Sequence, residues 1–168
     1  HEISDLLCNE INLVSDLSGL EHFTNVRYIQ MFGEGEVIED VTPILALKKL
    51  QWVTMENKGL TDEVMAPLAN YRSIANFWDV LNFQDNQLSD SDLFNDWFSY
   101  QIPTYFYLDE NNYTTSPAII FEHDFNGSLY LSGNPIADVT DELERLSSTN
   151  IGQLTLGELG LDQLEQVV

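Results

Sequence analysis

Two segments of this sequence share one pattern of apolar and polar residues: residues 50–62 read LQWVTMENKGLTD, and residues 78–90 read WDVLNFQDNQLSD. In each segment, apolar residues occupy the first, fourth, sixth and eleventh positions, and an aspartate occupies the thirteenth. Two apolar residues separated by one other residue favour a short strand that buries alternate side chains. The pattern therefore predicts a repeated unit made of a short strand followed by a turn.

The same unit recurs along most of the chain. Residues 126–138 (NGSLYLSGNPIAD) match it closely, and weaker copies begin near residues 3, 26, 102 and 151. A regular period of this length is typical of a solenoid, in which each unit buries its apolar face only against its neighbours. The central apolar residues are separated by 23, 24, 28, 24, 24 and 25 residues, and they are Leu6, Ile29, Val53, Leu81, Tyr105, Leu129 and Leu154.

This pattern resembles the leucine-rich repeat, whose signature is L-x-x-L-x-L-x-x-N-x-L. The segments VSDLSGLEHFTNV (14–26) and SGNPIADV (132–139) are similar to the bacterial internalin group of that superfamily. The resemblance implies an α/β solenoid, a curved horseshoe with short parallel strands on its concave face and short α or 3-10 helices and loops on its convex side. We expect one domain over residues 1–168, with about seven irregular repeats of 23–28 residues.

Residues 103–121 allow two interpretations. The even spacing on either side favours a degenerate repeat, whereas PTYFYLDENNYTTSPAIIF also suits a β-hairpin insertion joined at Asn111-Asn112. The asparagine of the signature can hydrogen-bond backbone groups where the chain leaves the strand. Irregular turns are expected, because this position holds Asn86 and Asn134 in two copies but Glu34, Lys58, Glu110 and Leu159 in others.

Short helices are predicted on the outer side of the turns. Capping residues precede apolar residues at three- and four-residue spacing, which favours helix formation. The predicted helices follow Thr61-Asp62, Ser89-Asp90 and Asp138, and another covers residues 43–50.

Charge and composition exclude several classes of function. Six basic residues against 28 acidic ones give a net charge of −22, which disfavours binding to nucleic acid or to an anionic membrane. No apolar run approaches the roughly 20 residues that cross a bilayer. The single cysteine, Cys8, excludes an intrachain disulfide framework, and its place in the pattern predicts a small buried apolar residue. The start at His1, without an initiator methionine, indicates a processed or shortened chain.

No arrangement of residues indicates catalysis, so we predict no enzymatic activity and no cofactor. Glu34-Gly35-Glu36 suits a solvated turn, and His123-Asp124 lacks a suitably spaced nucleophile. The three histidines do not have the spacing of zinc ligands. Calcium stays an alternative at the acidic runs 90–92 and 109–112, but neither run matches a calcium-binding loop. We expect a helix cap and a polar turn there, and no metal site.

The strand pattern also predicts the residues of the concave face. Of eighteen outward positions, one carries a carboxylate and none carries a lysine or arginine, although the chain has 28 acidic residues. Protein interfaces are depleted in charge and enriched in aromatic residues. A shift of the strand pattern by one residue would bury these side chains instead. We predict that a partner binds Tyr28, Phe32, Trp52, Glu56, Asn82, Phe106, Leu108 and Tyr130.

We therefore predict a non-catalytic protein-recognition module. The internalin resemblance implies a secreted or cell-surface bacterial protein involved in adhesion, with a host or neighbouring-cell surface protein as its partner. Two alternatives remain: an intracellular leucine-rich-repeat scaffold or regulator, located in the cytoplasm, and a glycan-binding module in which Trp52 and Tyr28 stack on sugars.

Overall fold

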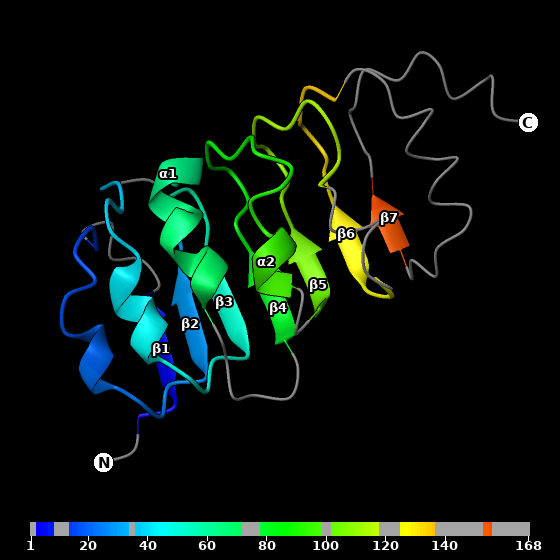
Figure 1. Ribbon diagram of the computed structural model, residues 1–168. Coiled ribbons are helices and arrows are strands. Elements are labelled where there is room, and N and C mark those ends of the chain that lie inside the picture. Colours follow the sequence, from blue (N-terminus) through cyan, green and yellow to red (C-terminus); the bar gives the residue numbers. More distant parts are fainter. Residues whose placement is uncertain are drawn as a thin grey trace, which may run out of the picture.

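The computed structural model describes residues 3–8, 14–33, 36–71, 78–98, 102–117, 125–136 and 153–155. Its main feature is one open parallel sheet whose strands lie side by side in the order in which they occur along the chain (Figure 1). None of the described helices is long and apolar enough to cross a membrane. The strands are β1 (Asp5–Cys8), β2 (Tyr28–Met31), β3 (Trp52–Met55), β4 (Trp78–Asn82), β5 (Pro103–Tyr107), β6 (Ser128–Tyr130) and β7 (Gln153–Thr155).

The pairing of the strands confirms most of the predicted alignment. Leu6 pairs with Ile29, Ile29 with Val53, and Val53 with Leu81, so the central apolar residues lie in one row. Alternate side chains of a strand point to opposite faces, so this row and the apolar residue two positions later both point to the helix side. There they form a continuous core, and Cys8, which was expected to be buried, packs against this core but is only partly buried.

The predicted alignment of β5 is wrong by one residue. Leu81 pairs with Phe106, and not with Tyr105, and both Phe106 and Leu108 are buried, at 0% exposed. Tyr105, which was expected in the core, is 42% exposed. The correct alignment places Pro103 at the leading apolar position, so the repeat starts one residue later than predicted. The expectation that Phe106 and Leu108 face outward is therefore incorrect.

The segment 103–121 contributes a strand to the parallel sheet. β5 pairs in parallel with β4 on one side and with β6 on the other. Among the described residues of this segment, 103–117, β5 is the one strand, and residues 118–121 lie outside the described part. The extent of the domain stays a prediction.

Short helices lie on one face of the sheet (Figure 1). The hydroxyl of Thr61 caps α1 (Asp62–Met65) by accepting a hydrogen bond from the Val64 N–H (3.3 Å). The predicted helix after residue 61 is present, the one predicted over 43–50 ends at Ala46, and the one after residue 90 begins only at Asn95. The one predicted after Asp138 lies outside the described residues. The helices are η1 (Leu20–His22), η2 (Thr42–Ala46), α1 (Asp62–Met65), which continues as η3 (Ala66–Asn70), and α2 (Asn95–Phe98).

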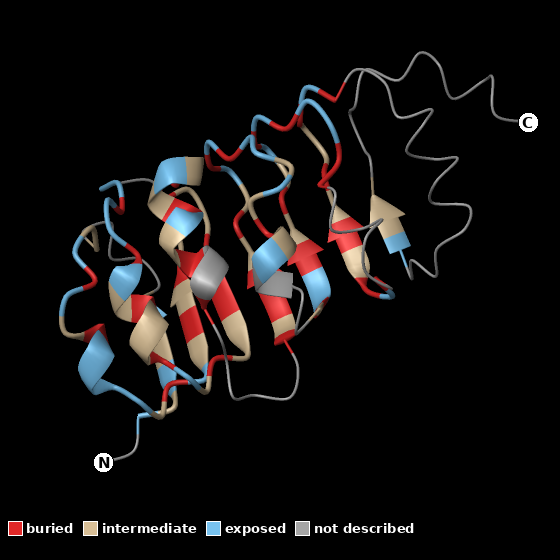
Figure 2. Cartoon of the chain, in the orientation of Figure 1, coloured by how far each residue is buried: buried red, intermediate tan, exposed pale blue. Residues whose placement is uncertain are grey.

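Buried residues concentrate on strands β2 to β6 and on the inner side of the helices (Figure 2). Next to this core, three asparagines form a hydrogen-bonded series through successive turns. Asn86 Oδ1 accepts from the N–H of Lys58 and of Leu60, both at 3.0 Å. Asn111 Oδ1 accepts from Leu88 N–H, and Asn134 Oδ1 from Tyr113 N–H, in the same way.

This series corrects the expected irregularity of the turns. Asn111, and not Glu110, occupies the asparagine position of the fifth repeat, because the repeat starts one residue later. Lys58 does occupy the position in the third repeat, where it is 2% exposed and its Nζ donates to the Gly33 carbonyl (3.0 Å). Glu34 and Leu159 lie outside the described residues.

In the five turns that the structure describes at this point, the residue before the asparagine position has a left-handed backbone conformation, with φ between 52° and 100°. Such a φ costs little for glycine and more for other residues. The turn therefore imposes the same backbone geometry on different residue types, and these are Gly33, Asn57, Asp85, Glu110 and Gly133.

Candidate functional site

The face of the sheet opposite the helices is the candidate site, and we call it the open sheet face. It corresponds to the predicted concave face. Its positions follow from the observed strand pairing and from the alternation of side chains along each strand. The open sheet face consists of Asp5, Tyr28, Trp52, Val80, Tyr105, Ser128 and Gln153 in a first row, Leu7, Gln30, Thr54, Asn82, Tyr107, Tyr130 and Thr155 in a second, and Phe32, Glu56, Gln84, Asp109 and Ser132 beyond the strand ends.

An aromatic pair lies near the amino-terminal end of the sheet. Tyr28 and Trp52 are direct neighbours on β2 and β3, with ring centroids 6.4 Å apart and planes inclined by 50°. The indole Nε1 of Trp52 donates to Thr54 Oγ1 (3.0 Å), which fixes the orientation of the ring. Both rings are half-buried, so part of each is accessible to a partner.

A second aromatic group lies on β5 and β6. The rings of Tyr107 and Tyr130 stack, with centroids 4.3 Å apart and planes inclined by 13°. Burial and the neighbouring Tyr130 raise the pKa of Tyr107 above its usual value, so the phenol of Tyr107 stays neutral and able to donate a hydrogen bond at neutral pH. Tyr105, one row away, is exposed. The group therefore presents aromatic surface with polar hydroxyl ends.

Two carboxylates lie where the face meets the ends of the strands. Burial and the nearby Asp85 raise the pKa of Glu56, and a hydrogen bond from the Asn82 side chain opposes that shift. Burial also raises the pKa of Asp109, whose Oδ1 accepts from the Ser132 N–H at 2.9 Å. The expectation that Glu56 is the single charge on the face is therefore wrong, because the shifted alignment of β5 adds Asp109 and β1 adds Asp5.

The structure brings most of the predicted site residues together on this face: Tyr28, Phe32, Trp52, Glu56, Asn82 and Tyr130. Their role in binding stays a prediction. Phe106 and Leu108 belong to the core instead, and Tyr105 and Tyr107 replace them on the face. One signal in the sequence indicated the correct alignment. Asn111 follows Phe106 by five residues, as Asn86 follows Leu81 and Asn134 follows Leu129.

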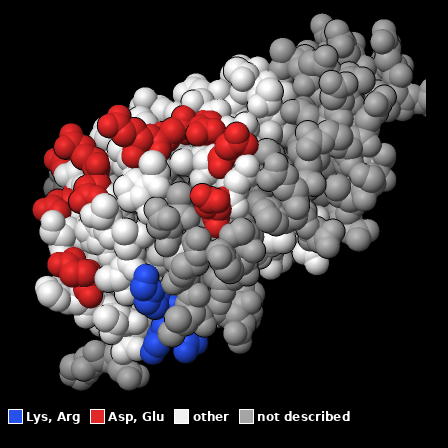
Figure 3. Space-filling view, viewed as in Figure 1, with Lys and Arg blue, Asp and Glu red and all other residues white. Residues whose placement is uncertain are grey.

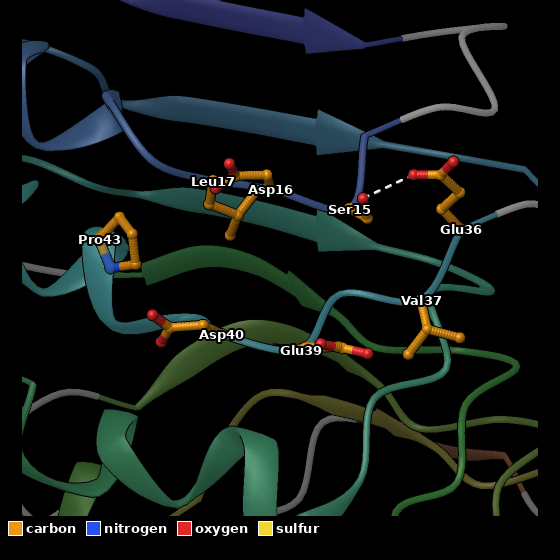
Figure 4. A pocket seen from close by; sticks show the side chains of 8 residues that line it. All are labelled: Ser15, Asp16, Leu17, Glu36, Val37, Glu39, Asp40 and Pro43. Carbon is orange, nitrogen blue, oxygen red and sulfur yellow. Dashed lines mark hydrogen bonds between the residues drawn. The ribbon is translucent and has the colours of Figure 1, made fainter.

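A cavity of about 620 Å³ lies away from the open sheet face and is lined by Ser15, Asp16, Leu17, Glu36, Val37, Glu39, Asp40 and Pro43 (Figure 4). Its carboxylates accept hydrogen bonds from neighbouring groups: Ser15 Oγ donates to Glu36 (2.6 Å), and hydrogen bonds from Ser18 lower the pKa of Asp16. Within the described ranges, no three acidic, histidine or cysteine side chains are grouped to hold a metal ion. This cavity therefore holds acidic residues that are hydrogen-bonded within a turn.

The sequence matches no protein-family model and no curated protein. Among solved structures, it is similar to an internalin (inlF) from Listeria monocytogenes, with a TM-score of 0.59 and 20% sequence identity. The match covers 86% of this chain and 45% of the internalin chain, so this chain spans less than half of that protein. Together with the parallel sheet and its asparagine series, this similarity shows that the chain has a leucine-rich-repeat fold like that of an internalin.

Proposed function

We propose that this chain is a non-catalytic protein-recognition module that binds its partner on the open sheet face. The observation that carries the proposal is the placement of Tyr28, Trp52, Tyr105, Tyr107 and Tyr130 on a rigid sheet, each with accessible surface. Aromatic residues on a fixed scaffold lose little conformational entropy on binding and often dominate the energy of an interface.

The chemistry of the face supports recognition rather than reaction. Its aromatic groups are separated by amides and hydroxyls on β3 and β4, such as Thr54 and Asn82. These groups form hydrogen bonds but supply no nucleophile with an adjacent base, which covalent catalysis requires. A partner with both apolar and hydrogen-bonding groups fits this composition.

The proposal also includes the kind of partner and the location of the protein, and both are suggested by the similarity in fold. An internalin-like fold supports a secreted or surface-attached protein that binds a protein on a host or neighbouring cell. The glycan-binding alternative would use the same rings, because sugars stack on aromatic faces. A glycan array would show binding only in that case.

The experiment is a screen of cell-surface protein ectodomains with the chain presented as a tetramer. The test variant carries Trp52→Ala and Tyr130→Ala, one residue from each aromatic group. The matched control is Phe23→Ala, which removes an aromatic side chain that is 38% exposed but lies on the η1 turn. Circular dichroism and melting curves verify that each variant is folded.

We expect the wild type and Phe23→Ala to bind the same ectodomain, and the double variant to lose at least about 2 kcal/mol of binding energy. Binding that survives in the folded double variant contradicts the proposal, because the partner would then contact another surface. Binding that is lost equally in Phe23→Ala contradicts it as well.

A further inference from the structure

Charge is distributed unevenly between the two edges of the sheet. Three of the four described cations lie before strand starts: Arg27 directly precedes β2, and Lys48 and Lys49 lie four and three residues before β3. They form one basic group at the lower border of the molecule, and acidic residues line the opposite, upper border (Figure 3). The fourth described cation, Lys58, is buried in the turn that follows β3. We call the group formed by Arg27, Lys48 and Lys49 the basic edge.

The opposite edge of the open sheet face is acidic. Glu56, Asp85, Asp109 and Glu110 all follow strands β3 to β5, and all are partly or fully exposed. A partner that lies across the face therefore meets positive charge before β2 and β3 and negative charge after β3 to β5. The electrostatic potential of the face is therefore expected to differ in sign between these two borders, which favours one orientation of a partner with the opposite charges.

The basic edge is continuous with the aromatic pair of the open sheet face. A depression of about 370 Å³ lies there, lined by Ser4, Asp5, Asn25, Arg27, Tyr28 and Lys49. Tyr28 belongs both to this depression and to the pair with Trp52. Lys49 Nζ donates to Asn25 Oδ1, which positions the ammonium, and an ammonium has three N–H donors. Lys48 lies over the ring of Tyr71, 5.3 Å from its centroid.

We infer that the basic edge receives an acidic segment of the partner protein, while adjoining apolar residues of that partner contact Tyr28 and Trp52. This inference rests on the proposed function, since it names the chemistry of the partner at one end of the same face. Carboxylates match the ammonium and guanidinium donors of the depression.

A short acidic segment fits better than a dense polyanion. The net charge of −22 repels a heparin-like chain or a nucleic acid over its whole length, and three cations cannot compensate for that. Asp5 and Asp79 also lie near the strand starts. A protein segment with a few carboxylates at one end and neutral or basic residues at the other meets favourable charge at both edges.

The test uses a phage library of random 12-residue peptides selected on the wild-type chain. Enriched peptides are synthesised in two forms, one with their Asp and Glu residues and one with Asn and Gln in their place. Both forms are titrated against wild type and against Arg27→Gln/Lys49→Gln. The matched control, Gln87→Glu/Asn112→Asp, also lowers the net charge by 2 but changes exposed residues on outer turns.

We expect enriched peptides to carry acidic residues near one end and apolar residues beside them. The amide form should bind wild type and the control at least about fivefold more weakly than the acidic form, and the difference should fall below about twofold in Arg27→Gln/Lys49→Gln. Raising NaCl from about 50 to 500 mM should reduce the same difference, because salt screens exposed charges.

The inference is overturned if no peptide is enriched, if the enriched peptides show no acidic preference, or if the preference persists in Arg27→Gln/Lys49→Gln. Heparin that binds wild type but not this variant, without an acidic preference among peptides, identifies a polyanion site and also overturns it. Failure of the proposed function looks different. In that case, the selected peptides bind Trp52→Ala/Tyr130→Ala as well as they bind wild type.

Discussion

The side-chain oxygen of Asn86 accepts a hydrogen bond from the backbone N–H of Lys58, at the equivalent position one repeat earlier (3.0 Å). Its Nδ2 donates to the carbonyls of Met55 and Phe83, both at 2.9 Å, so one amide satisfies backbone groups of two successive repeats. A buried backbone N–H or carbonyl without a partner costs free energy. At these turns the strand ladder ends, so the asparagine side chain supplies the partners that the backbone groups would otherwise lack. The asparagine position therefore holds neighbouring repeats together.

Asn111 and Asn112 provide a direct test of this role. Asn111 is buried and bonds Leu88 N–H and the Phe83 and Leu108 carbonyls, whereas Asn112 is exposed. We expect Asn111→Ala to lower the free energy of unfolding by about 2–4 kcal/mol, because it leaves several buried groups unpaired. Asn112→Ala should cost less than about 0.5 kcal/mol. Urea melts measure both, and equal costs would place the fifth repeat in another alignment.

Phe106 and Tyr105 test the alignment of β5 by their packing. Phe106→Ala removes a fully buried ring and should cost about 3–5 kcal/mol of stability. Tyr105→Ala removes an exposed ring and should cost less than about 1 kcal/mol. Chemical denaturation of the two variants distinguishes the alternatives. A larger loss of stability for Tyr105→Ala than for Phe106→Ala would instead support the alignment that the even spacing of the repeats predicts.

Glu110 has a φ of 52°, which is unfavourable for a residue with a Cβ. Glu110→Gly should raise the free energy of unfolding by up to about 1 kcal/mol, since the relief of backbone strain exceeds the extra entropy of the unfolded glycine. Glu110→Ala is the control, because it removes the same charge but keeps the Cβ. If both variants melt at the same temperature, charge and not backbone strain explains the change.

Glu56 should make stability depend on pH. Its pKa in the folded chain is raised above the ordinary value of 4.5, so the folded state binds its proton more tightly than the unfolded state. This contribution stabilises the fold below the ordinary pKa and is lost as the pH rises through the folded pKa. Glu56→Gln should therefore melt at a higher temperature than wild type at pH 7. This difference in melting temperature should become smaller toward pH 4.

The control for that experiment is Glu39→Gln, which removes the same charge from an exposed turn. We expect Glu39→Gln to raise the melting temperature at pH 7 by less than Glu56→Gln does. The difference in melting temperature from wild type should also change less with pH. Equal profiles for the two variants would show that general repulsion among the acids, and not the partial burial of Glu56, produces the effect.

Salt should stabilise the whole chain. A net charge of −22 on 168 residues favours expansion through repulsion among carboxylates. Raising NaCl from low concentration to about 0.15 M shortens the Debye length to about 8 Å and should raise the melting temperature. Differential scanning calorimetry measures the shift, and a melting temperature that does not change with salt contradicts the prediction.

Most of the sheet could be predicted from local patterns. The alternation of apolar residues predicts that Leu6, Ile29, Val53 and Leu81 lie in one row, and the observed pairing confirms that row. The repeats of Val53 and Leu81 have a clear pattern of apolar and polar residues, and the regular period extends their alignment to the weaker repeats of Leu6 and Ile29. The aromatic pair of Tyr28 and Trp52 on the open sheet face follows from the same rows.

The fifth repeat shows where such reasoning ends. In IPTYFYLDENN, nearly every residue from 102 to 108 is apolar or aromatic, so alternation alone does not decide which side chains face the core. The sequence by itself determined the repeat, its period and the acidity of the chain, because these depend only on residue order and composition. Tertiary structure decided that Phe106 is buried and that Tyr107 stacks on Tyr130, because parallel pairing with β4 and β6 and the bonds of Asn111 act between repeats.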